Sequence, residues 1–160
     1  AVQNSILVTI VDDEHPLKDW IGTYSVAAVS YANPGVWDED WTIITSPNES
    51  SVDNLNIVGI GGNTVPVVAT LDTVAMTIEM KSPSALGKTY GYDNVSLYYA
   101  TDEILAVANG YINTGMLEAA SKQKIIGTIE KDGTIKIDRL AIVLDDYVFV
   151  WDCFNTTWTK

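Results

Sequence analysis

Short runs of apolar and β-branched residues alternate with polar positions along the chain, and turn-forming residues separate them about every ten positions, a spacing typical of antiparallel β-structure. We expect strands at residues 20–29, 37–44, 52–60, 65–71, 73–80, 95–100, 124–130, 134–138, 140–144 and 147–151. Asp132-Gly133 predicts a tight hairpin, because Asp-Gly readily takes the positive φ angles of such turns. Pro66 places its strand at a sheet edge or at a strand start.

Sequential hairpins with almost no helix predict an all-β fold built as an antiparallel meander. At 160 residues the favoured solution is a single up-and-down β-barrel of about 8–10 strands, and a β-sandwich is the alternative. We assign the barrel domain to residues 19–160 and treat residues 1–18 as an N-terminal strand or a linker, since residues 5–11 form an apolar, β-branched run. Residues 81–94 are expected to be irregular, and residues 101–122 are ambiguous between short helices and strands.

Composition excludes several classes of function. The formal net charge is −12, which disfavours nucleic acid as a partner because nucleic-acid binding depends on Lys and Arg neutralising phosphates. The chain has one cysteine, Cys153, and one histidine, His15, so a cysteine-built metal cluster and a disulfide framework are ruled out. No transmembrane segment is expected, because no run reaches the ~18–20 apolar residues that a bilayer requires. The sequence predicts neither a cofactor nor a metal site.

The segment Trp20-Ile-Gly-Thr-Tyr24, which follows a one-turn helix expected at residues 16–19, resembles the signature of the calycin or lipocalin-like class. Tyr24 stands where the classical signature has Trp. Residues 66–72, 76–80 and 127–135 are similar to hairpin motifs in lipocalin-like domains of secreted lipoproteins from gut-type Gram-negative anaerobes.

This resemblance implies a non-catalytic, exported domain in the periplasm or at the outer-membrane surface. It also implies a lipid anchor in a region preceding residue 1. The acidic, Trp- and Tyr-rich composition with few lysines fits export.

Trp37 and Trp41 flank the acidic run Asp38-Glu39-Asp40. Alternation along a strand would put both indoles on one face with Asp38 and Asp40 on the other. Such indoles stack on sugar rings while neighbouring carboxylates accept bonds from hydroxyls. The competing interpretation places both tryptophans in the barrel core or at its rim.

Tyrosines surround the expected irregular stretch. Tyr90 and Tyr92 lie on a glycine-flexed loop, where binding residues are often found on β scaffolds, although capping of the barrel is the alternative. Tyr98 and Tyr99 must point to opposite sides of one strand, so one of them, with Tyr98 the candidate, is available to a ligand.

No catalytic constellation is recognisable, and we predict no enzymatic activity. Paired acids such as Asp145-Asp146 fit a hairpin turn, and Cys153 follows an apolar strand as a buried thiol would. The first functional hypothesis is therefore binding of a small apolar molecule or an oligosaccharide. The second is a structural or protein-interaction module whose barrel is filled by side chains and takes no small ligand.

Overall fold

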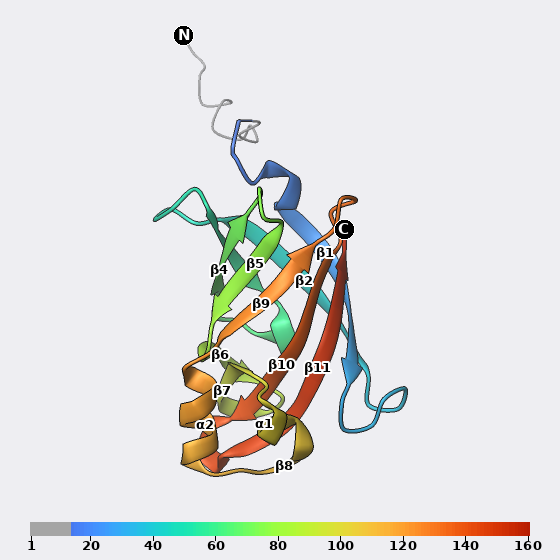
Figure 1. The fold of residues 1–160 in the computed structure, drawn as a ribbon, viewed down its shortest axis with the longest axis vertical. Coiled ribbons are helices and arrows are strands. Elements are labelled where there is room, and N and C mark those ends of the chain that lie inside the picture. Colours follow the sequence, from blue (N-terminus) through green and yellow to red (C-terminus); the bar gives the residue numbers. More distant parts are fainter. Residues whose placement is uncertain (1–13) are drawn as a thin grey trace.

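Eight antiparallel strands close into a barrel of lipocalin-like form (Figure 1). The computed structural model describes residues 14–160, so the strand predicted at residues 5–11 lies outside the described residues. Around the barrel each strand pairs with the next, and β11 returns to pair with β1. The order is β1 (Gly22–Ser30), β2 (Glu39–Pro47), β3 (Asn54–Val58), β4 (Val67–Asp72), β5 (Thr77–Lys81), β9 (Lys124–Ile129), β10 (Ile135–Leu144) and β11 (Phe149–Thr159). The predicted up-and-down barrel is confirmed.

A long insertion separates β5 from β9 and gathers at the lower end of the barrel, opposite the C-terminus (Figure 1). It consists of β6 (Ser84–Thr89), β7 (Tyr92–Tyr99), α1 (Asp102–Ala106), β8 (Gly110–Tyr111) and α2 (Thr114–Ser121). Strand β10 pairs with β9 through its first residues and with β7 through its last five. The expectation that residues 81–94 are irregular is wrong, because a β6–β7 hairpin occupies most of them.

Short 3-10 turns complete the fold: η2 (Lys18–Trp20), η3 (Ile60–Gly62) and η4 (Asp145–Tyr147). The turn expected at residues 16–19 is found as η2. Asp145-Asp146 forms the predicted turn between β10 and β11. Pro66 immediately precedes β4, which is paired on both sides, so this proline begins a strand and does not mark a sheet edge.

Side chains fill the barrel as one continuous hydrophobic core. Alternate residues of β1 and β2 point inward, as the sequence pattern predicts. Tyr24 and Trp158 are fully buried there and meet edge to face, with ring centroids 6.3 Å apart. Each large side chain buried in this way stabilises the fold by about 1.5–3 kcal/mol.

A second, smaller core lies between the outer face of the sheet and the two helices. Ile104 of α1 and Ala120 of α2 pack there with Val143, Val150 and Cys153. The helices therefore cover part of the outer barrel wall. Within residues 14–160, no helix has the length and apolar character to cross a membrane.

Candidate functional site: an aromatic cleft at the lower rim

The carboxylate of Glu39, the first residue of β2, collects three hydrogen bonds at the lower rim of the barrel. Its Oε1 accepts from the indole N–H of Trp41 at 2.9 Å and from the hydroxyl of Tyr90 at 2.6 Å. Its Oε2 accepts from the indole N–H of Trp151 at a longer 3.4 Å. Bonds to an ionised acceptor are roughly twice as strong as neutral ones, so Glu39 fixes three aromatic rings around one point.

Tyr90 reaches Glu39 from the turn between β6 and β7. Thr89 and Tyr92 face each other across the hairpin, which leaves Tyr90 and Gly91 as a two-residue turn with φ of 57° and 82°. This is the type I′ pattern, in which both central residues take positive φ. A tyrosine in this conformation is strained, and such strain persists only where surrounding contacts hold it. Burial, and secondarily the bond to Glu39, raise the pKa of the Tyr90 hydroxyl.

Trp151 is placed by an irregularity in β11. Ile142 pairs with Asp152 and Val143 pairs with Val150, so Trp151 is the extra residue of a β-bulge. Bulges redirect side chains and are common beside functional sites. The redirected indole packs against Tyr90, with ring centroids 4.8 Å apart and planes tilted by 31°.

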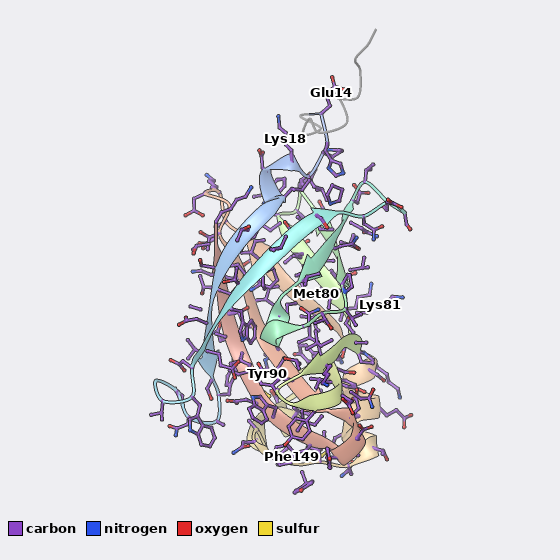
Figure 2. The ribbon with its side chains drawn as sticks, turned by 180° about the vertical axis from the view of Figure 1, so that it is seen from behind. Glu14, Lys18, Met80, Lys81, Tyr90 and Phe149 are labelled. Atoms are coloured by element: carbon purple, nitrogen blue, oxygen red, sulfur yellow. The ribbon has the colours of Figure 1, made fainter. Side chains whose placement is uncertain are left out.

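Further aromatic rings extend this group along the rim. Tyr92 meets Trp151 at 6.4 Å and Tyr147 at 5.6 Å, centroid to centroid. Phe149 and Tyr111 pack edge to face at 4.9 Å on the neighbouring strands β11 and β8. Figure 2 places both Tyr90 and Phe149 in the lower half of the molecule.

Two hollows lie over these rings and share Asn109 and Trp151, and we call them together the rim cleft. The acidic hollow has a volume of about 260 Å³ and is lined by Trp37, Glu39, Asn109, Trp151 and Asp152. The aromatic hollow has a volume of about 350 Å³ and is lined by Tyr92, Asn109, Tyr111, Leu144, Tyr147, Phe149 and Trp151. The cleft thus offers flat rings as walls, with carboxylate and amide groups between them.

The loop of residues 31–38 brings Trp37 to the acidic hollow. Asp38 accepts backbone N–H bonds from Ser30 and Gly35, at 2.9 and 3.0 Å, and so closes the loop on itself. Asp152 of β11 anchors the same loop, because its carboxylate accepts from the Ser30 hydroxyl and from the backbone N–H of Ala32. Trp37 is left 45% exposed.

The residues singled out from the sequence occupy different places. Trp37 and Tyr92 line the rim cleft, and Tyr90 supports it through Glu39 and Trp151. Trp41 is buried with its ring edge to face with Phe154 at 5.3 Å, so it supports Glu39 from the core side. Tyr98 is half-buried against the core under the helices.

The prediction of one strand face for Trp37 and Trp41 is wrong. Strand β2 begins at Glu39, so Trp37 belongs to the preceding loop. Tyr98 and Tyr99 do point to opposite sides of β7, since Tyr98 packs on the core under the helices and Tyr99 on the barrel core.

Sequence reasoning missed Glu39, Asn109 and Trp151. Glu39 was one of three adjacent acids with nothing to distinguish it. Asn109 has a φ of 60°, a conformation for which asparagine is enriched, but its turn fell in the ambiguous segment. The alternation of Phe149 and Trp151 in the last strand was the one sequence signal for the aromatic side of the rim cleft.

Among residues 14–160, no group of three or more His, Cys, Asp or Glu side chains is placed to hold a metal ion. Cys153 is buried as predicted, and burial is the main cause that raises its pKa to about 12, so the thiol stays protonated at neutral pH.

Comparison of the chain with protein-family models, with curated proteins and with solved structures found no match. The assignment of a lipocalin-like barrel therefore rests on the topology itself.

Proposed function

We propose that this chain is a non-catalytic binding domain that takes an oligosaccharide in the rim cleft. The observation that carries the proposal is the combination of flat aromatic walls with fixed polar groups. Trp37, Trp151 and Tyr147 line the cleft with aromatic rings, and Glu39 and Asn109 add a carboxylate and an amide to its lining. Sugars present complementary surfaces, because one face of the ring is rich in C–H groups while its edge carries hydroxyls.

The filled interior argues against an apolar ligand inside the barrel. Lipocalin-like barrels of about eight strands have room either for one small ligand or for packed side chains. Here the interior is a continuous core that includes Tyr24, Phe154 and Trp158. An apolar ligand would have to displace these side chains, whereas a glycan at the rim would not.

Isothermal titration calorimetry with a panel of oligosaccharides tests this proposal. The panel should contain neutral, acetamido, amino and acidic tetrasaccharides. We expect at least one class to bind, and Trp37→Ala to weaken that binding about tenfold or more, because removing a central Trp from a binding site commonly costs about 2 kcal/mol.

The matched control is Val36→Ala. Val36 is 70% exposed in the same loop and does not line the rim cleft, so this variant should bind as the wild type does. Absence of binding by the whole panel, or equal weakening by both variants, would contradict the proposal.

The second candidate is a structural or protein-interaction module, and the filled interior favours it. A groove of about 530 Å³ on the outer face of β4 and β5 would then be the contact surface. Val65 and Val68 line this groove and are 40% and 44% exposed. Two results together would establish this function: the wild type binds no glycan, and Val68→Asp loses the binding to a protein partner that the wild type shows.

We also propose that the barrel is an exported domain of the type found in bacterial surface lipoproteins. The support is the similarity of its hairpin motifs at residues 66–72 and 127–135 to such domains, together with its acidic composition. Fractionation of the source cells with an antibody against the barrel tests this. Recovery in the soluble cytosolic fraction would refute it.

A further inference from the structure

We propose that the acidic hollow of the rim cleft binds the ammonium group of an amino sugar, so that the preferred glycan carries a free amine. This inference rests on the proposed glycan binding and specifies its ligand class. Its basis is a hollow with two indole walls and two carboxylates, lined by Trp37, Trp151, Glu39 and Asp152.

The first argument is that the protein supplies no cation to balance these carboxylates. All nine Lys and Arg side chains fall within residues 14–160, and none lines either hollow of the rim cleft. The ion pairs of this part of the chain join Lys88 to Asp93, Lys124 to Glu79, Lys136 to Glu130 and Arg139 to Asp102. Glu39 and Asp152 take part in none of them. Carboxylates withdrawn from water without a cation are costly, and a cationic ligand removes that cost.

The second argument concerns the state of Asp152. This residue is 2% exposed, and its pKa is raised chiefly by burial, with the nearby charge of Glu39 contributing in the same direction. Hydrogen bonds from the Ser30 hydroxyl and the backbone N–H of Cys153 fix the carboxylate. Holding a negative charge at Asp152 therefore costs free energy, and a cation bound beside this fixed carboxylate would reduce that cost.

The third argument is the acceptor that Glu39 keeps available. Its Oε1 already takes two strong bonds, whereas its Oε2 takes one long contact of 3.4 Å from Trp151. A carboxylate oxygen can accept two good hydrogen bonds, so Oε2 has capacity for an ammonium donor.

The indoles add an attraction specific to cations. The face of a tryptophan ring carries negative quadrupole potential, and Trp binds cations better than Tyr or Phe does. Trp37 and Trp151 line the same hollow as the carboxylates, so an ammonium group there would meet both kinds of partner. A neutral sugar would gain the stacking but not the charge.

Calorimetric titration with three matched β-1,4-linked tetrasaccharides tests the inference: the glucosamine tetramer, its fully N-acetylated form and cellotetraose. The pH should keep the amines protonated. We expect the glucosamine tetramer to bind about tenfold or more tightly than the other two. In Glu39→Gln, the ratio of the affinity for the glucosamine tetramer to the affinity for either of the other two tetramers should fall close to one.

The control for general attraction to an acidic protein is Asp40→Asn. Asp40 is exposed beside Glu39 in the chain but points to the outer face of β2, so this variant should keep the preference. Equal binding of all three tetramers by the wild type would overturn the inference and leave glycan binding intact. A preference that survives Glu39→Gln, or that Asp40→Asn abolishes, would also overturn it. Binding of none of the three, and of no other glycan in the panel, would remove both proposals.

Discussion

The hydroxyl of Tyr90 donates a 2.6 Å hydrogen bond to Glu39, which joins the β6–β7 turn to the start of β2. The two residues are separated by 51 positions in the sequence. Because Glu39 also accepts from Trp41 and Trp151, this one contact connects the insertion, the barrel core and the bulge of β11. The shape of the rim cleft depends on it.

Tyr90→Phe should therefore destabilise the protein. The substitution removes one donor from a half-buried carboxylate, a loss of about 1.5–3 kcal/mol for a bond to a charged group. For a domain of this size, Tm should fall by roughly 3–12 °C. Thermal unfolding followed by circular dichroism measures this.

The matched control is Tyr92→Phe. Tyr92 belongs to the same aromatic group, and its hydroxyl makes no hydrogen bond to any other residue among residues 14–160. The Tm of Tyr92→Phe should match that of the wild type. If the two variants unfold at the same temperature, the Tyr90–Glu39 bond does not support the rim.

Gly127→Ala should destabilise the barrel itself. Gly127 lies in β9, and a Cβ at this position would lie 2.5 Å from a side-chain carbon of Ile137 and 2.6 Å from the backbone oxygen of Lys136. Overpacking of this kind costs typically about 1–3 kcal/mol. Urea unfolding of Gly127→Ala should show a lower midpoint with an unchanged m-value.

Gly115→Ala in helix α2 provides the comparison. Its added Cβ would approach only the side-chain amide oxygen of Asn113, at 3.2 Å. Alanine is favoured over glycine in a helix, so the midpoint should stay the same or rise. A midpoint for Gly127→Ala equal to that of Gly115→Ala would show that β9 shifts to make room.

Alkaline pH should weaken the fold through Cys153. Its pKa rises from an ordinary 9.0 to about 12 in the folded protein, chiefly because the thiol is buried. The unfolded chain loses this proton first, so stability is fully present below pH 9 and falls as pH rises toward 12. One such group contributes a slope of up to about 1.4 kcal/mol per pH unit.

Urea unfolding at a series of pH values measures this slope, and Cys153→Ala should reduce it whatever its effect on stability at neutral pH. Tyr24 adds a similar contribution, since burial raises its pKa to about 12, so a residual slope should remain. Identical slopes in wild type and Cys153→Ala would contradict the assignment.

The barrel was predictable from sequence because its signals are local. Inward residues such as Val26 and Ile43 alternate with outward ones along their strands, and Asp132-Gly133 marks a hairpin by its own chemistry. The β6–β7 hairpin was not predictable in this way. Its turn uses Tyr90 in a left-handed conformation that is held by contacts with Glu39 and Trp151, both distant in the sequence.

The rim cleft was predictable only in part, for a similar reason. Tyr92 was found because it lies in a predicted glycine-containing loop. Trp37 was found because it flanks an acidic run, although the strand face assigned to it was wrong. Trp151 was missed because a β-bulge places it, and its alternation with Phe149 was the only hint in the sequence. Glu39 became distinct from Asp38 and Asp40 only when three donors from separate segments converged on it.

The most direct test of the rim cleft as a glycan site is an NMR titration of the five tryptophan indole N–H signals with the tetrasaccharide that binds best. Trp37 and Trp151 line the cleft, whereas Trp158 is buried in the barrel core and Trp20 lies at η2 near the opposite end. We predict that the signals of Trp37 and Trp151 shift and saturate together while those of Trp158 and Trp20 stay in place. Shifts confined to Trp158 and Trp20, or no shift in any of the five, would contradict the account.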